Sequence, residues 1–201
     1  MIARVLPYGP GAALIECARG HAVSLGQALL ATGCFVEVVP AEQSVLVLLP
    51  RAMTLPDVQG IASSLPEQLP AAAGREIEIP VVYDGEDLAF VAQVTGLDVA
   101  AVVALHSGRE YSAAFAGFAP GYVYCTGLAP ELWIPRRPSP RTRVPAGSVA
   151  IADAYTATYP QASPGGWHLL GRTDLTLFDL TRSEPALIRP GDRVRFTVRT
   201  S

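Results

Sequence analysis

The sequence predicts an α+β protein of two domains, a split βαβ sandwich over residues 1–79 followed by a β-barrel over residues 80–201. Three observations lead to this prediction. Strand and helix periods alternate in the first 79 residues, two short helical patterns follow, and from Glu110 onward short β-type runs are separated by Pro and Gly. With 201 residues, half of them apolar, the chain can bury a sizeable core.

The first domain shows the element order βαββαβ. Strands are expected at residues 12–18, 34–40, 44–50 and 75–80, and helices at 21–32 and 54–69. The first helix ends at Gly33, and an early proline marks the start of the second. This order is that of a ferredoxin-like α/β sandwich.

The second domain begins with two short helices and continues with strands. Asp84 is a plausible N-cap of the first helix, Gly96 ends it, and Asp98 caps a second helix that runs to His106. Strand-like runs follow at residues 110–118, 147–160, 167–171, 175–180 and 192–199. Many short strands at this spacing are typical of a barrel or a sandwich.

The charged residues exclude several classes of protein. All fifteen basic residues are arginine, so the chain has no P-loop lysine, no Schiff-base lysine and no biotinyl-lysine. A net charge of −3 argues against general nucleic-acid binding, which needs a broad basic face. Any anion binding must use arginine side chains or backbone amides.

The apolar runs, the cysteines and the histidines argue against further classes of protein. No apolar run reaches the roughly 18 residues that a membrane span needs, and the N-terminus lacks the pattern of a signal peptide, so a cytoplasmic protein is expected. The cysteines form no C-x-x-C pair, and the histidines form no metal-binding pair. No metal site is therefore expected.

The most unusual segment is "RRPSPRTRVPAGS", residues 136–148, which connects two predicted strands. It carries four arginines, and prolines at positions 135, 138, 140 and 145 stiffen it. Guanidinium groups that are held in place bind carboxylate or phosphate oxygens bidentately, so the segment is a candidate anion site. The alternative is a solvated loop whose arginines lie in water.

Two glycine-rich segments and one histidine are further candidates. "GFAPGYVYCTGL", residues 117–128, offers an aromatic wall for a small ligand or a glycine-bent strand end packed on the barrel. "YPQASPGGWHLLGRT", residues 159–173, offers a backbone anion nest or a turn packed by Trp167. His106 either stabilises a helix end or titrates in catalysis. The sequence has no G-x-S-x-G or H-E-x-x-H motif.

Taken together, the segments 117–128, 139–152, 159–173 and 189–196 resemble the family called the 5-oxoprolinase B subunit, allophanate hydrolase subunit 1 or inhibitor of the sporulation sensor kinase. They are also similar to one half of the carboxyltransferase domain of urea carboxylase. The resemblance runs from about residue 80 to residue 201, and the N-terminal third fits in layout.

The resemblance implies a fold, a reaction and partners. The fold is an α/β domain followed by a cyclophilin-like β-barrel. The reaction is the ATP-dependent opening of 5-oxoproline to L-glutamate, with ATP as co-substrate of the complex and no metal or biotin bound covalently by this chain. The partners are the homologous C subunit, a second cyclophilin-like barrel that is sometimes fused to this one, and the third, lactam-utilising A subunit. Neither nucleic acid nor a membrane is an expected partner.

The positions that match the family pattern define the expected site. His106, Arg141 and Ser148 are expected to take part in catalysis. Substrate or anion binding is expected from Phe118, Gly121, Tyr124, Arg136, Arg141, Gly147, Thr156, Tyr159, Gly165, Gly166 and Trp167. No metal ligand is expected. Arg137 looks replaceable and Arg143 structural.

One departure from the family pattern bears on the substrate. Where the family usually reads "GQTGIYP" this chain has "AYTATYP", so Tyr155 replaces a glutamine and Ala157 a glycine. Two alternative functions stay open beside the 5-oxoprolinase. One is a non-catalytic inhibitor or binder of a sensor histidine kinase. The other is a subunit of an allophanate hydrolase or of a urea carboxylase-like complex.

Overall fold

A computed structural model describes residues 2–66, 68–69 and 74–200 of the chain. The chain divides into two compact units, Met1–Ala73 and Gly74–Ser201. The border falls between residues 73 and 74 rather than between 79 and 80, because the strand expected to end the first domain pairs with a strand of the second unit.

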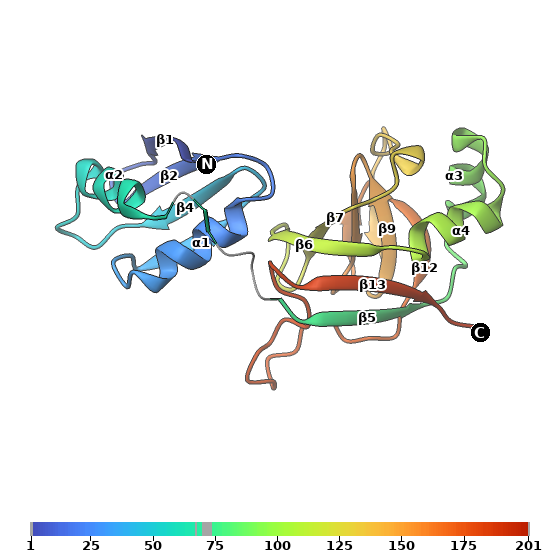
Figure 1. Cartoon of the computed structure of the whole chain (residues 1–201). Helices are drawn as coiled ribbons and strands as arrows, with labels where there is room; N and C mark the ends of the chain where they lie inside the picture. Colours follow the sequence, from blue (N-terminus) through green and yellow to red (C-terminus); the bar gives the residue numbers. More distant parts are fainter. Residues whose placement is uncertain (1, 67, 70–73, 201) are drawn as a thin grey trace. The chain divides into compact units, whose positions relative to one another are not determined.

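The first unit is a four-stranded antiparallel sheet with two helices (Figure 1). The strands lie in the order β1-β2-β4-β3, and their bounds are Ile2–Pro7, Ala12–Cys17, Glu37–Pro40 and Ser44–Leu48 for β1 to β4. The helices are α1 (Ala22–Ala31) and α2 (Leu55–Ser64), and α2 begins with a capping box between Thr54 and Asp57. The core consists of fully buried side chains from both layers, namely Ile15, Leu25, Leu29, Val45, Val47 and Val58.

The ferredoxin-like order predicted for this unit is not confirmed. The sheet holds a strand that was not expected, β1, whose Arg4 forms an ion pair with Glu16 on β2 at 2.7 Å. The strand expected at residues 75–80 is absent from this sheet and belongs to the second unit. Position along the chain therefore does not decide which sheet a strand joins.

The second unit is built on a seven-stranded sheet in the order β12-β9-β10-β7-β6-β13-β5. Its strands are β5 (Glu76–Val81), β6 (Glu110–Ala116), β7 (Val123–Thr126), β9 (Ser148–Ala152), β10 (Tyr155–Thr158), β12 (His168–Arg172) and β13 (Arg193–Val198). A bridge between Val82 and Arg172, with hydrogen bonds of 2.9 Å in both directions, links the two edges. The sheet is thus nearly closed into a barrel, which is consistent with the expected cyclophilin-like fold.

The strand that the sequence analysis assigned to the first domain, at residues 75–80, is β5, and it pairs in parallel with β13. Both strands alternate apolar and charged residues, so Ile79 and Phe196 face the barrel core while the opposite face is charged. On that charged face Arg193 donates to Glu76 at 2.7 Å. Figure 1 shows the two strands side by side.

Two helices cover one end of the barrel, α3 (Leu88–Thr95) and α4 (Val99–Ser107), as the sequence predicts. Gly96 ends α3 with a φ of 71°, and the Asp98 carboxylate accepts from the N–H of Ala101 at 2.7 Å. The N-cap of α3 is Asp87 rather than Asp84, and its side chain makes no capping hydrogen bond.

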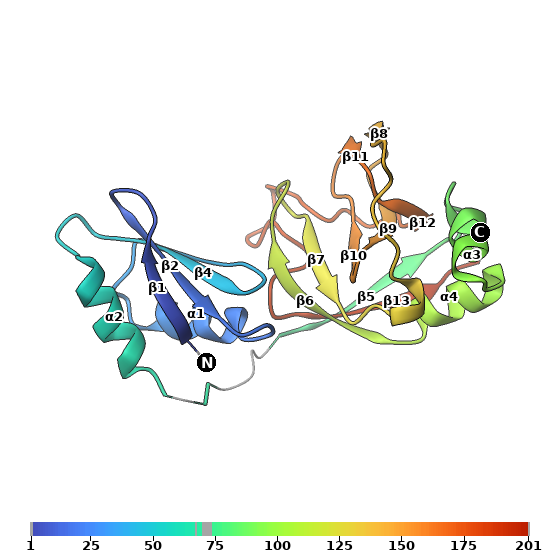
Figure 2. The same ribbon diagram turned by 90° about the horizontal axis from the view of Figure 1, so that it is seen from above.

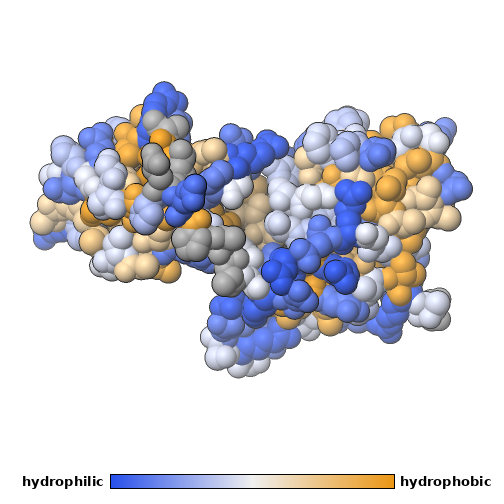
Figure 3. Space-filling view, in the orientation of Figure 1, coloured by the Kyte–Doolittle hydropathy of each residue, from blue (hydrophilic) through white to orange (hydrophobic). Residues whose placement is uncertain are grey.

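The outer face of this helix pair is apolar. Phe90, Val94 and Val99 are 47%, 53% and 43% exposed, and Figure 3 shows apolar residues at this end of the second unit. Among the described residues, no single helix is long and apolar enough to span a membrane; α3 and α4 pass that test only as a pair bent by 97°.

Two connections of the second unit differ from expectation. The segment 136–148, expected to connect two strands, itself contains the short strand β8 (Arg141–Val144). This strand pairs with β11 (Ser163–Gly165) in a separate two-stranded sheet (Figure 2). A one-turn 3₁₀ helix, η1, spans Pro130–Leu132. The strand expected at residues 175–180 is wrong, because only a bridge between Phe178 and Ala186 forms there. At its end the Asp179 carboxylate accepts from the N–H of Thr181 at 2.9 Å, which makes a turn.

Candidate functional site

The structure brings two of the candidate segments together. The arginine segment, which comprises residues 135–145, lies along the turn that contains Gly165 and Gly166. The pairing of β8 with β11 joins them, the N–H of Arg137 donates to the carbonyl of Gly166 at 2.8 Å, and His168 Nε2 donates to the carbonyl of Pro135 at 3.0 Å. The arginine segment is therefore ordered on a fixed support rather than solvated along its length.

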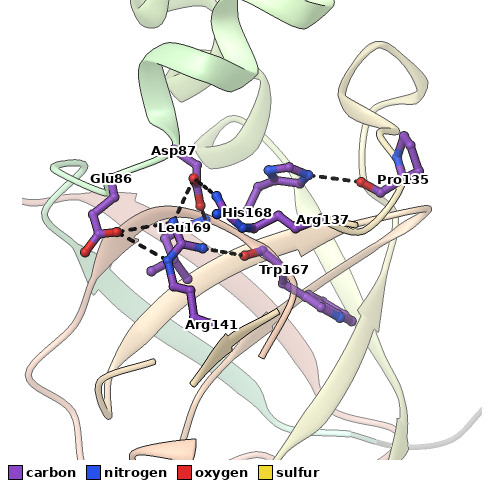
Figure 4. Close-up of polar contacts among 8 residues, drawn as sticks. All are labelled: Glu86, Asp87, Pro135, Arg137, Arg141, Trp167, His168 and Leu169. Atoms are coloured by element: carbon purple, nitrogen blue, oxygen red, sulfur yellow. Dashed lines mark hydrogen bonds and ion pairs between the residues drawn. The ribbon is translucent and has the colours of Figure 1, made fainter. Parts of the chain in front are cut away.

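Asp87 is the centre of an ion-pair cluster with two of the arginines (Figure 4). Its Oδ1 accepts from Arg137 Nη1 and from Arg141 Nη2, both at 2.8 Å, and its Oδ2 accepts from the N–H of Leu169 at 2.7 Å. Arg141 also donates to Glu86 at 3.2 Å. Asp87 is 4% exposed, so this carboxylate is a buried charge whose partners satisfy it.

The charges in this cluster balance one another. Burial alone would raise the pKa of Asp87, but the hydrogen bonds from Arg141 and Leu169 and the charges of Arg141 and Arg137 hold that pKa below its usual value. The hydrogen bond to Asp87 in turn raises the pKa of Arg141. The predicted anion-binding residue Arg141 is thus engaged by carboxylates of its own chain.

Arg136 differs from its neighbours in the same segment. Its side chain is exposed, and it makes no hydrogen bond or ion pair within residues 2–66, 68–69 and 74–200. Burial raises the pKa of Tyr122, Tyr124 and Tyr159, and the positive charge of Arg136 opposes that rise at each of them. The charge of Arg136 therefore acts electrostatically on all three tyrosines.

These tyrosines belong to an aromatic group on the face of the sheet opposite the barrel core, which we call the tyrosine cluster. It consists of Phe118, Tyr122, Tyr124, Tyr159 and Trp167. Neighbouring rings meet edge to face, with centroids 5.2 Å apart for Tyr122 and Tyr159 and 5.6 Å apart for Tyr124 and Trp167. Tyr122 and Tyr159 are each 1% exposed, whereas Phe118 is 62% exposed, so one ring of the cluster faces solvent.

Backbone geometry explains the glycines and marks Phe118. The hydroxyl of Tyr159 lies against Gly165, where a Cβ would approach its ring Cζ to 2.9 Å. Gly121 has a φ of 79°, and a Cβ there would lie 2.7 Å from Phe178 Cβ. Phe118 has a φ of 69°, which is uncommon for a bulky side chain and is found mostly where the surroundings enforce it.

The anion nest expected at the Gly165–Gly166 turn stays a prediction. The carbonyl of Gly166 accepts from the N–H of Arg137 at 2.8 Å, and the Trp167 ring meets Tyr122 and Tyr124 edge to face, with ring centroids 5.9 Å and 5.6 Å apart. These contacts fit the second alternative named for this segment, a turn packed by Trp167.

His106 and Thr156 lie together in the barrel core, on the face away from the tyrosine cluster. Thr156 Oγ1 donates to the carbonyl of Ala150 at 3.1 Å, so it accepts from His106 Nε2–H at 2.9 Å, and His106 Nδ1 accepts from the Tyr83 hydroxyl at 2.7 Å. Burial, with the nearby charge of Arg109, lowers the pKa of His106 to about 3. His106 is therefore a neutral, fully bonded core residue.

Gly147 and Ser148 contact Tyr159 of the tyrosine cluster through backbone hydrogen bonds. The N–H of Gly147 donates to the carbonyl of Tyr159 at 2.8 Å, and the N–H of Tyr159 donates to the carbonyl of Ser148 at 2.9 Å. Gly147 has a φ of 79°, and a Cβ there would collide with the carbonyl of Thr173. These two residues hold Tyr159 in place; the catalytic function expected of Ser148 stays a prediction.

Asp87 and Glu86 are site residues that the sequence did not identify. An aspartate at the start of a helix predicts a cap, and Asp98 does cap α4, but Asp87 turns its carboxylate toward two arginines instead. Within the described residues no group of three or more His, Cys, Asp or Glu side chains is arranged to hold a metal ion.

A nearly closed barrel with two covering helices and an arginine segment on its outside is consistent with a protein of the cyclophilin-like class. TTHA0988, known from a crystal structure, superposes with a TM-score of 0.84 and 36% identity over 96% of this chain and 40% of that chain. This chain thus spans well under two thirds of TTHA0988. The urea carboxylase of Kluyveromyces lactis, at 19% identity and a TM-score of 0.70 over 99% of this chain and 23% of that one, shares the fold alone.

The chain belongs to the family described as carboxyltransferase domain, subdomain C and D, whose model matches residues 3–188. Among its relatives is the 5-oxoprolinase B subunit of Escherichia coli O157:H7, 45% identical over 178 residues, which are 86% of this chain and 82% of the relative. Another is the 5-oxoprolinase B subunit of Bacillus subtilis (strain 168), 37% identical over 180 residues, which are 81% of this chain and 75% of the relative.

Proposed function

We propose that this chain is the B subunit of an ATP-dependent 5-oxoprolinase and acts in a complex with the homologous C subunit, a second barrel, and with the third, lactam-utilising A subunit. Relatives named as 5-oxoprolinase B subunits at 45% and 37% identity support this assignment. The likeness to urea carboxylase is one of fold and supports neither urea nor allophanate as substrate. A cytoplasmic location stays a prediction.

The chemistry of the reaction sets what the site must do. A lactam carbonyl is a poor electrophile, and transfer of the terminal phosphoryl group of ATP to its oxygen makes the ring carbon open to attack by water. One ATP and two waters are consumed: the first water opens the phosphorylated ring to an acyl phosphate, the second hydrolyses that acyl phosphate, and ADP, phosphate and glutamate are formed. The enzyme must hold the substrate carboxylate and the lactam oxygen in fixed positions during these steps.

The observation that carries the proposal for this subunit is the placement of Arg136. The residues on both sides of Arg136 are tethered to the 165–168 turn, while its own guanidinium is free of intramolecular partners within the described chain. A pre-organised cation beside an aromatic group suits a small anionic ring such as 5-oxoproline. Arg136, Phe118 and Tyr124 are the proposed substrate contacts, and Tyr159 and Trp167 support them from beneath.

The direct test is reconstitution of the three subunits with 5-oxoproline and ATP, followed by measurement of ADP and glutamate. Both products are expected at equal rates, and both should be lost when this chain is left out. Arg136→Ala should lower kcat/KM for 5-oxoproline by about tenfold or more, as expected for loss of a charged hydrogen bond. Arg143→Ala, which removes another exposed arginine of the same segment, is the control and should leave the rate near that of wild type. Absence of both products from the complete wild-type complex would overturn the proposal.

A further inference from the structure

Asp87 occupies the position of a helix cap, but its carboxylate binds other elements. It is the N-cap residue of α3 and makes no capping hydrogen bond, whereas Asp98 does cap α4 at 2.7 Å. Its Oδ2 accepts from the N–H of Leu169 on β12 at 2.7 Å, and its Oδ1 accepts from Arg137 and Arg141, both at 2.8 Å. Both oxygens therefore bind groups that lie 50 to 82 residues further along the chain.

The two arginines that Asp87 holds also contact the turn at Gly166 and Trp167. The backbone N–H of Arg137 donates to the carbonyl of Gly166 at 2.8 Å. Arg141 Nη1 donates to the carbonyl of Trp167 at 3.5 Å, and Figure 4 shows the Arg141 guanidinium between Asp87 and that carbonyl. Each arginine thus joins the Asp87 carboxylate to the turn.

The proposed substrate contacts lie in two parts of the molecule, the arginine segment and the tyrosine cluster. Trp167 packs within that cluster, where it is 6% exposed and its ring meets Tyr124 edge to face at 5.6 Å. Leu169, two residues on, belongs to the same buried group. Asp87 binds Leu169 directly and reaches Trp167 through its arginine partners. Its carboxylate therefore holds the two parts of the proposed site against each other.

The burial of Asp87 determines how it can act. The residue is 4% exposed, and its two oxygens accept three hydrogen bonds from within the chain. Glu86 supplies a second negative charge opposite Arg141 at 3.2 Å, so two carboxylates balance two guanidiniums. Separating these groups is costly, because it would leave a buried charge unpaired. Asp87 is thus placed to act through the residues that it holds rather than on a substrate.

We infer that Asp87 is a positioning residue of this site: its carboxylate fixes the arginine segment relative to the tyrosine cluster. The identity of the substrate rests on the proposed function, whereas the fixing of the two parts rests on the contacts of Asp87. Parts that are held in place lose less entropy when a ligand binds. Loosening them should weaken substrate binding without removing any group that touches the substrate.

Trypsin, which cleaves after arginine, tests whether Asp87 holds the arginine segment. The bonds after Arg141 and Arg143 lie in β8, which is paired with β11, so cleavage there requires local opening. Asp87→Asn keeps the shape of the side chain but loses its charge, and it should speed cleavage at these bonds by about tenfold or more. Asp84→Asn, which breaks an exposed ion pair at 2.9 Å, is the matched control and should be cleaved at the wild-type rate. Mass spectrometry of the fragments locates the bonds.

The fluorescence of Trp167 tests the tyrosine cluster in the same chains. The sequence has two tryptophans, so with Trp133→Phe in every variant Trp167 is the single fluorophore of its kind. Asp87→Asn should shift its emission to longer wavelength and increase its quenching by acrylamide, because the buried ring becomes accessible. Asp84→Asn should change neither. A folded Asp87→Asn chain with wild-type cleavage and wild-type quenching would overturn the inference.

Arg137→Gln replaces Asp87→Asn if the latter does not fold. Its side chain is 34% exposed, and the change removes one of the two guanidiniums from Asp87 while the Arg141 ion pair remains. Cleavage after Arg141 should again be faster than in wild type. Unchanged cleavage and quenching in the folded Arg137→Gln chain would then overturn the inference.

Kinetics of the reconstituted complex distinguish positioning from catalysis. Asp87→Asn should raise KM for 5-oxoproline more than it lowers kcat, and Asp87→Glu, which restores the charge, should recover part of the loss. A fall in kcat at unchanged KM would make Asp87 a catalytic residue and would contradict the inference. A wild-type complex without turnover would remove the proposed function, while cleavage and quenching of the isolated chain would still decide what Asp87 does.

Discussion

The Tyr159 hydroxyl and the Gly165 backbone occupy adjoining space with no room for a side chain between them. A Cβ on Gly165 would approach the Tyr159 ring to 2.9 Å at Cζ and 3.0 Å at Cε1. A Cβ on the next residue, Gly166, would find its nearest neighbours, Arg137 O and Pro140 Cβ, at an ordinary 3.6 Å. Two consecutive glycines therefore meet different requirements, and only the first is set by the tyrosine cluster.

Gly165→Ala is expected to destabilise the protein by about 1–3 kcal/mol, the usual cost of overpacking a buried region. The ring of Tyr159 must shift to make room, so binding at Arg136 should weaken as well. Chemical denaturation gives the change in free energy of unfolding. Gly166→Ala is the control and should change that free energy by less than about 0.5 kcal/mol; equal losses for the two variants would contradict the packing described.

The buried imidazole of His106 makes stability depend on pH. Its pKa is about 3 in the folded protein and about 6.5 when unfolded, so between these values the unfolded chain binds the proton more readily. Stability contributed by the neutral ring is complete above about pH 6.5 and falls by about 1.4 kcal/mol per pH unit as the pH drops toward 3. The free energy of unfolding, measured at about pH 7.5 and about pH 5.5, should therefore decrease at the lower pH.

A His106→Gln chain is expected to lose most of this pH dependence in that window, because glutamine does not titrate. His21→Gln is the matched control, since His21 is exposed and lies in the first unit. It should keep the wild-type slope. A wild-type free energy of unfolding that is the same at both pH values would show that His106 is not buried in the neutral form.

The hydroxyl of Thr156 should contribute more to the free energy of unfolding than its methyl group does. Thr156→Val keeps the shape but leaves the His106 Nε2–H and the carbonyl of Ala150 without their partner, at an expected cost of about 1–3 kcal/mol. Thr156→Ser keeps the hydroxyl and loses one methyl group, at about 1 kcal/mol. Thermal and chemical denaturation of both variants decide the order. A valine variant as stable as the serine variant would contradict the hydrogen-bond chain from Tyr83 to Ala150.

Phe118 is expected to lower the stability of the protein and to contribute to the binding of 5-oxoproline. Its φ of 69° costs about 1–2 kcal/mol for any residue with a Cβ, and glycine avoids this cost. Phe118→Gly should therefore be more stable than Phe118→Leu, which keeps the unfavourable backbone and also loses the ring. Both variants should bind 5-oxoproline less well than wild type. A leucine variant that melts at the higher temperature would mean that the backbone around residue 118 relaxes on mutation.

The parts of the fold that the sequence predicts correctly are those with local signals. Helices α3 and α4 follow from an apolar stripe, an αL glycine at Gly96 and a cap at Asp98, all within a few residues. The partner of β5 does not follow, because its alternation fits any sheet with one apolar face. Its actual partner, β13, carries the matching alternation and the matching charge of Arg193, but 117 residues away.

For the site too, the sequence predicts local features but not contacts between residues far apart in the chain. Family resemblance brought the arginine segment and the 159–173 segment into one hypothesis, and the structure places them in contact. It did not foresee that Arg141 and Arg137 are bound to Asp87, 54 and 50 residues away, because an isolated aspartate at a helix start carries no sign of this. The binding functions expected of Arg136 and Arg141 stay predictions. His106 matched the family pattern, but only the folded chain shows that both of its nitrogens are bonded in the core.

The parallel pairing of β5 with β13 also bears on how the chain is made. The barrel cannot close during synthesis until residues 193–198 have left the ribosome, and a contact across 117 residues is entropically slow to form. Until then β6 lacks β13 as its neighbour and exposes an unpaired edge of the kind that aggregates. The first unit has a separate core and can form earlier. Barrel closure is thus expected to be the last and slowest folding step, and the one most dependent on chaperones.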